Sequence, residues 1–164
     1  MSTTTLTTTK VTGHYGFAET HQLSGSDHQL LRSVQSWQPD DVICSFGSSV
    51  IHDHPSKYTV QIAEDKHIIL SPEFLQYINH SCNPNAFFNT TTMELIALKA
   101  IEPGEEFTFF YPSTEWFMAE PFNCLCGEAN CIGVIKGAKE INSYTLSQYR
   151  LTDFIQSKID QLKD

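Results

Sequence analysis

Three cysteines crowd into one short segment of the chain, and their spacing is typical of metal ligands. Cys124, Cys126 and Cys131 follow the pattern Cys-x-Cys-x4-Cys. Thiolates are zinc ligands, and a closed structural zinc site needs four ligands. We expect Cys82 to be the fourth, because Cys44 lies in an apolar stretch typical of a core residue. The alternative for any single cysteine is a small, buried, hydrophobic side chain.

The composition predicts one globular domain. The chain has 164 residues, of which 40% are hydrophobic, and this is enough for one core and excludes intrinsic disorder as the main description. No apolar run approaches the roughly 18 residues that span a bilayer, so no membrane association is expected. The first residues are Thr-rich and lack the pattern of a secretory signal. We therefore expect an intracellular protein, nuclear or cytoplasmic and not secreted, in which metal-bound thiolates are favoured over disulfides.

The charge balance of the chain is acidic. Ten Lys and Arg stand against nineteen Asp and Glu, which gives a net charge of −9. This sign opposes binding to nucleic-acid phosphates and favours a basic partner, so no direct nucleic-acid binding is expected. Acidity that serves only solubility is the alternative. The sequence does not indicate an oligomeric state.

Short runs of β-branched and aromatic residues, bounded by turn residues, predict a mostly β domain. Strands are expected at residues 42–46, 58–62, 67–70, 86–88, 95–98 and 106–110. Helical spacing is weak at residues 30–37 and clearer at residues 146–162, where an apolar stripe predicts a C-terminal helix that docks on the domain. Residues 1–10 are expected to form a disordered tail.

Two further blocks precede the cysteine cluster. The first is Asn79-His80-Ser81-Cys82-x-Pro84-Asn85, and the second is Gly104-Glu105-Glu106-Phe107-Thr108-x-x-Tyr111. In this order and spacing, the three blocks resemble the SET-domain family with its post-SET zinc segment, over roughly residues 39–135. The resemblance implies a fold of several small sheets with a pseudoknot, plus the C-terminal helix. It divides the chain into a SET domain at 11–111, a post-SET segment at 112–137 and a helical extension at 138–164.

The resemblance also implies an activity, the methylation of a lysine side chain in a histone or non-histone protein. The methyl donor would be S-adenosylmethionine, and S-adenosylhomocysteine would be the product. A free lysine has a pKa near ~10.4, so a narrow apolar channel that disfavours the ammonium form would help to supply the neutral amine. Tyr77, Phe107 and Phe109 are expected to line such a channel, and Tyr111 takes the position of the family's catalytic tyrosine. Phe109 stands where a Tyr limits relatives to one methyl group, so di- or trimethylation is expected.

The remaining site residues are expected to bind the cofactor. Asn79 and His80 match the family's cofactor-binding pair, and Phe122 is a candidate for an aromatic lid. Gly13 is expected to approach the cofactor closely, although Tyr15 stands where the second glycine of the family's turn is usual. This irregular turn supports an alternative, a SET-fold binding or scaffold protein with weak or no catalysis.

Overall fold

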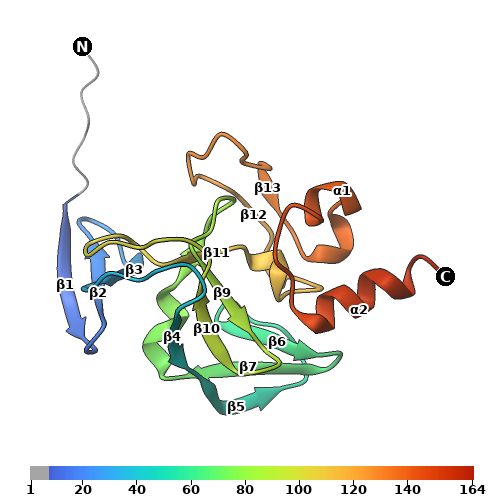
Figure 1. Cartoon of the computed structure of the whole chain (residues 1–164), viewed down its shortest axis with the longest axis horizontal. Helices are drawn as coiled ribbons and strands as arrows, with labels where there is room; N and C mark the ends of the chain where they lie inside the picture. Colours follow the sequence, from blue (N-terminus) through green and yellow to red (C-terminus); the bar gives the residue numbers. More distant parts are fainter. Residues whose placement is uncertain (1–7) are drawn as a thin grey trace.

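The computed structural model describes residues 8–164, and their strands form five small sheets (Figure 1). The N-terminal sheet has the order β1-β2-β3, and all its pairings are antiparallel. Its strands are β1 (Thr9–His14), β2 (Ala18–Leu23) and β3 (Gln29–Ser33). The disordered tail expected at residues 1–10 is wrong for Thr9 and Lys10, because these residues begin β1. Residues 1–7 lie outside the described part.

Two further antiparallel sheets hold most of the core. One has the order β4-β10-β9 and the other the order β5-β7-β6. Their strands are β4 (Val42–Ser45), β5 (Gly47–His52), β6 (Thr59–Ala63), β7 (Lys66–Ser71), β9 (Ala86–Asn89) and β10 (Glu94–Ala97). Five of the six predicted strands coincide with these elements. Fully buried side chains such as Ile68, Phe88 and Leu95 join the two sheets in one hydrophobic cluster.

Two pairs of very short strands complete the β structure. β8 (Asn79–His80) lies parallel to β11 (Thr108–Phe109), and β12 (Phe122–Asn123) lies antiparallel to β13 (Val134–Ile135). The strand expected at 106–110 is reduced to β11. The short helices are η1 (Glu73–Tyr77), η2 (Tyr111–Ser113), η3 (Ala138–Glu140), α1 (Ser143–Leu146) and α2 (Asp153–Gln161). No helix in the described residues is both long and apolar enough to cross a membrane.

Both helical predictions need revision. The segment at 30–37 is not a helix, because its first half is β3, which hydrogen-bonds β2 on one side and residues 104–107 on the other. The C-terminal pattern forms α1 and α2 instead of one helix, since Thr152 has extended backbone angles and its hydroxyl caps α2 by accepting from the Ile155 N–H. The expected docking is confirmed, because Leu146 and Ile155 pack with Phe110 in a second hydrophobic cluster.

Candidate active site and metal centre

A cleft of about 1290 Å³ lies beside the pairing of β8 with β11. The two strands place Thr108 opposite Asn79 and Phe109 opposite His80. Because β8 belongs to the first sequence block and β11 to the second, the parallel pairing brings the two blocks together. Asn79, His80, Phe109 and Tyr111 all line the cleft.

Asn79 is held by a network of hydrogen bonds at the edge of the cleft. Its side-chain amide donates to the Gln29 carbonyl at 3.0 Å and to Glu106 Oε1 at 3.2 Å. Glu106 belongs to the second block and Gln29 to β3, so one amide connects three segments. This network fixes the orientation of Asn79 in the cleft.

His80 is fixed in one tautomer by its two neighbours. Its Nδ1 accepts from the Tyr111 backbone N–H at 3.2 Å, which leaves Nε2 as the protonated nitrogen, 3.4 Å from Cys82 Sγ. Burial lowers the pKa of His80 to about 4, so the imidazole is neutral near pH 7. The ring lies 5.3 Å from the Tyr111 ring and 5.8 Å from the Phe122 ring, measured between centroids.

Tyr111 begins η2, which Phe110 separates from β11, and its phenol lies in a largely buried environment. Burial raises the pKa of Tyr111 well above its usual value, and the charges of Glu106 and Glu115 raise it further. The hydroxyl therefore stays protonated at neutral pH. It can orient a dipole or donate a hydrogen bond, but it is a poor general base.

The residues expected in an apolar channel divide between the cleft and the core. Tyr77 and Phe109 line the cleft, with the Phe109 ring 4.7 Å from that of Tyr111. The prediction that Phe107 lines the channel is wrong, because its side chain is fully buried in the main core and packs against Phe17. The Phe107 N–H donates to the Leu31 carbonyl of β3, and the pairing with β8 begins only at Thr108.

The residues expected to bind the cofactor also divide. Phe122 lines the cleft with Asn79 and His80, whereas Gly13 and Tyr15 do not. Tyr15 instead stacks on Phe74 with ring centroids 4.1 Å apart, and its hydroxyl lies against Gly13.

Residues of the N-terminal sheet that the sequence did not single out also line the cleft. His28, Gln29 and Arg32, from β3 and the turn before it, are in its lining. No motif marks them in the sequence, because only the pairing of β3 with β2 and with residues 104–107 places this segment beside the cleft.

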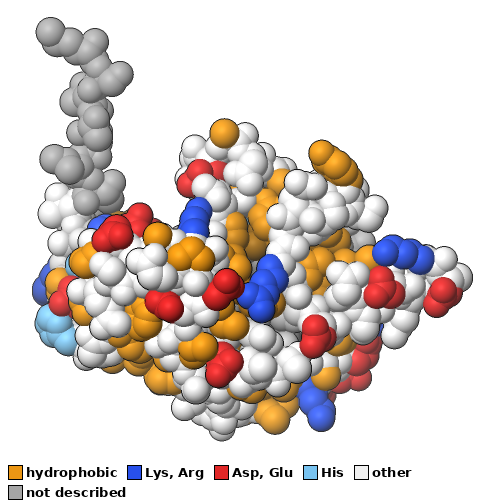
Figure 2. Space-filling model, in the orientation of Figure 1, with side chains coloured by type: hydrophobic (Ala, Val, Ile, Leu, Met, Phe, Trp, Pro, Cys, Tyr) orange, Lys and Arg blue, Asp and Glu red, His pale blue; other side chains and the backbone are white. Residues whose placement is uncertain are grey.

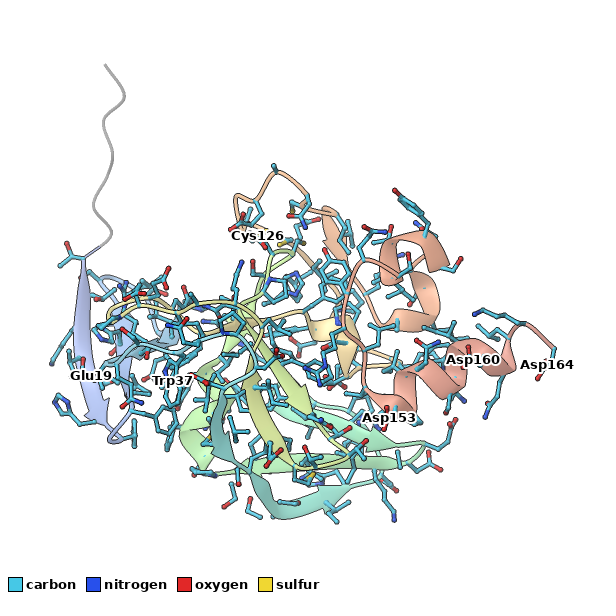
Figure 3. All side chains as sticks on the ribbon, viewed as in Figure 1. Glu19, Trp37, Cys126, Asp153, Asp160 and Asp164 are labelled. Atoms are coloured by element: carbon cyan, nitrogen blue, oxygen red, sulfur yellow. The ribbon has the colours of Figure 1, made fainter. Side chains whose placement is uncertain are left out.

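The four cysteines of the proposed metal site lie together. Cys82 is buried beside the cleft, and the other three lie between β12 and β13, where Figure 3 labels Cys126. Their sulfur atoms are all within 4.8 Å of one another, with Cys82 and Cys124 3.9 Å apart. Tetrahedral zinc with Zn–S bonds of about 2.3 Å needs sulfurs about 3.8 Å apart, so the donor set fits this ion.

The surroundings of Cys82 and the isolation of Cys44 support this ligand set. The Ile132 N–H points to Cys82 Sγ at 3.5 Å, and the Asn130 amide donates to the Cys82 carbonyl at 2.7 Å. Cys44 packs against the main core instead, and burial raises its pKa to about 11. Cys44 is thus outside the cluster, as expected from the sequence.

Glu115 is a buried acid in the cleft lining that the sequence did not single out. Its Oε1 accepts from the Gln61 N–H and the Thr114 hydroxyl, each at 3.0 Å, which ties the segment after η2 to β6. Burial raises the pKa of Glu115 to about 8, and these two hydrogen bonds oppose the rise. The carboxyl group is therefore largely protonated at neutral pH.

This raised pKa predicts a pH-dependent stability. Between about pH 4.5 and 8 the folded state holds the Glu115 proton and the unfolded state releases it, so the free energy of unfolding falls as the pH rises. The slope is at most about 1.4 kcal/mol per pH unit. Glu115→Gln keeps an acceptor oxygen and should remove this contribution to the pH dependence of the free energy of unfolding. Chemical denaturation at pH 5 and pH 8 measures the difference.

The matched control for that experiment is Glu120→Gln, because Glu120 is exposed in the same segment. It should keep the wild-type pH dependence. Equal slopes for the wild type and Glu115→Gln would contradict a carboxyl group that is neutral in the folded protein.

Comparisons with known proteins identify the family and its relatives. The family model described as SET domain matches residues 14–112. The chain is 44% identical over 84 residues to a protein of Aspergillus flavus named methyltransferase flvH, covering 50% of this chain and 47% of that one. It is 28% identical over 137 residues to a protein of Gibberella zeae named histone-lysine N-methyltransferase, H3 lysine-36 specific, covering 70% of this chain and 15% of that one. The chain thus spans about half or less of the length of these relatives.

A solved structure shares the fold. Its title is "crystal structure of KRYPTONITE in complex with mCHG DNA and SAH"; the TM-score is 0.53 at 23% identity, covering 68% of this chain and 27% of that one. The mostly β architecture of several small sheets is therefore confirmed.

Proposed function

Because the chain belongs to the SET-domain family, we propose that it is a protein-lysine methyltransferase that uses S-adenosylmethionine. One observation carries the proposal: the parallel pairing of β8 and β11 gathers Asn79, His80 and Tyr111 at one cleft. Related proteins named as histone-lysine N-methyltransferases support the same activity. Production of S-adenosylhomocysteine is part of this proposal.

The cleft residues fit such a cofactor. When bound, S-adenosylmethionine supplies an electrophilic methyl group on a positively charged sulfur. Asn79, His80 and Phe122 would hold it, and Tyr77 and Phe109 would surround the lysine side chain. The apolar walls disfavour the ammonium form, and the lysine proton leaves to solvent before transfer, since Tyr111 itself is protonated. Alignment of the amine supplies most of the rate.

The four cysteines would hold structural zinc beside this cleft. Cys124 and Cys126 line the cleft, and Phe122 lies two residues before Cys124. A closed site of four thiolates leaves no open position for catalysis. The metal would therefore fix one wall of the cleft and would take no part in the transfer.

The proposed substrate is a lysine in a basic protein segment. Carboxylates line the cleft at Asp27, Glu105, Glu106, Glu120 and Glu128, and acidic side chains are dispersed over the face in Figure 2. A histone tail fits this charge, as does a basic non-histone segment, and a nuclear location would follow from the first. We also propose that the chain does not bind nucleic acid directly.

The activity is tested with labelled S-adenosylmethionine on core histones, on peptides that together cover the lysines of histone H3, and on an array of non-histone lysine peptides. We expect label on lysine in at least one basic substrate. S-adenosylhomocysteine should also raise the melting temperature, because a ligand at 100 times its Kd stabilises the native state by about 2.7 kcal/mol. A melting shift without methyl transfer would favour the scaffold alternative, and the absence of both would contradict the proposal.

The Phe109 side chain predicts the number of methyl groups added. Phe109 is buried against Phe88 and Tyr111 and has no hydroxyl to hold a water beside the amine, so we propose di- or trimethylation. Phe109→Tyr should shift the product toward monomethyl-lysine, as measured by mass spectrometry of a methylated peptide. A wild-type enzyme that yields only monomethyl-lysine would contradict this prediction.

A further inference from the structure

Among the described residues, one cation of the cleft has a buried donor without a hydrogen-bond partner. Three basic side chains line it, Arg32, Lys57 and Lys99. Lys99 Nζ already donates to the carbonyl and the side-chain oxygen of Asn83, at 3.2 and 2.9 Å. Lys57 is exposed, with its Nζ 5.6 Å from the Tyr58 ring centroid. Arg32 alone combines a cleft position with a buried donor that has no partner among the described residues.

The guanidinium group of Arg32 has five N–H donors and makes one hydrogen bond to protein among the described residues. Nη1 donates to the Gly104 carbonyl at 3.0 Å, while the buried Nε has no partner. Arg32 also takes part in none of the ion pairs found in residues 8–164. Glu19, its partner on β2, directs its carboxylate to His14 and His21 instead. Since buried donors are normally satisfied, Arg32 is suited to an acceptor from outside the chain.

Arg32 is connected to Asn79 through two neighbours. Its backbone forms a β-bridge with Glu106, whose carboxylate accepts from the Asn79 amide at 3.2 Å. Gln29, three residues earlier on β3, accepts a second bond from the same amide. Figure 1 shows the loop that ends in β11 passing over β3. A ligand held by Asn79 would thus lie close to the Arg32 side chain.

From these contacts we infer that Arg32 binds the carboxylate at the amino-acid end of the cofactor. The inference rests on the proposed function, because S-adenosylmethionine and S-adenosylhomocysteine each carry a single anionic group, this carboxylate. A guanidinium fork matches a carboxylate in geometry as well as in charge. Gln76, which also lines the cleft, is neutral, and its amide donates to Glu73 at 3.4 Å.

The test is isothermal titration calorimetry with two ligands that differ by one group, S-adenosylhomocysteine and its decarboxylated analogue. Arg32→Met should weaken binding of S-adenosylhomocysteine about tenfold or more and leave the affinity for the analogue within about twofold. Lys57→Met is the matched control, since it removes an exposed cation from the same cleft, and it should change neither affinity beyond about twofold.

Equal effects of Arg32→Met on both ligands, or no effect on either, would overturn the inference and leave the proposed function standing. A wild-type protein that binds neither ligand would overturn both. Arg32→Lys keeps the charge but loses the fork and should show an intermediate loss for S-adenosylhomocysteine only. The wild type alone gives a further check, because a preference below about twofold for S-adenosylhomocysteine over its analogue excludes this role for Arg32.

Discussion

Replacing Tyr111 by Phe is expected to reduce the rate of methyl transfer by about a hundredfold to a thousandfold, the range found when one preorganised dipole is removed from a reacting centre. The change deletes only a hydroxyl. Because burial keeps this hydroxyl protonated, it acts as an oriented dipole, and no titration of Tyr111 should appear in the pH–rate profile near neutrality. Initial rates with labelled S-adenosylmethionine measure the effect.

The controls separate chemistry from folding. Tyr144→Phe removes the hydroxyl of a tyrosine on α1 that is 77% exposed, and it should keep the wild-type rate. The melting temperature of Tyr111→Phe, with and without S-adenosylhomocysteine, should stay near that of the wild type. Undiminished activity in Tyr111→Phe would refute the role assigned to this residue.

Removal of the metal is expected to have the second large effect, loss of both activity and the local fold around residues 122–135. Apart from the cysteine cluster, this segment is held by the bond from Asn130 to the Cys82 carbonyl, by the buried Ile135 and by the two-residue pair β12–β13, which contributes little stability alone. Structural zinc in small sites contributes about 10–16 kcal/mol at pH 7, comparable to or above the whole stability of a domain. A strong chelator, or Cys124→Ser, should therefore abolish methyl transfer and lower the melting temperature.

Metal analysis by mass spectrometry should find one zinc per chain, and added zinc should restore chelated wild-type protein. Cys44→Ser is the matched control, because Cys44 lies outside the cluster and should leave the zinc content unchanged. Full activity in protein that contains no metal would show that the cysteine cluster does not need an ion.

The sequence predicted those parts of the fold that depend on local pattern. The runs that became β4, β6, β7, β9 and β10 carry β-branched and aromatic residues between turn residues, so their own composition identifies them. The N-terminal strands β1 and β2 are rich in Thr, His and Gln and lack this pattern. β3 was concealed by a spacing that also suits a helix, and only its pairing with β2 and residues 104–107 decides between the two.

The candidate site was predicted where residue types carry chemistry and less well where geometry decides. The cysteine cluster and the gathering of Asn79, His80 and Tyr111 followed from recognisable blocks. Phe107 does not line the predicted channel, because the chain changes strand partner directly after it. Tyr15, which was predicted to bind the cofactor, stacks on Phe74 instead of lining the cleft. Arg32 and Glu115 were missed because burial and unused hydrogen bonds cannot be deduced from residue order.

The pairing of β8 with β11 also bears on how the molecule folds. Each strand contributes two residues, and the pair joins segments that are far apart along the chain, so closing it costs chain entropy that two short strands barely repay. The surrounding sheets must already be in place to hold the two segments together. We therefore expect the cleft to assemble late in folding, so that partly folded molecules present no fragment of the site to cofactor or substrate.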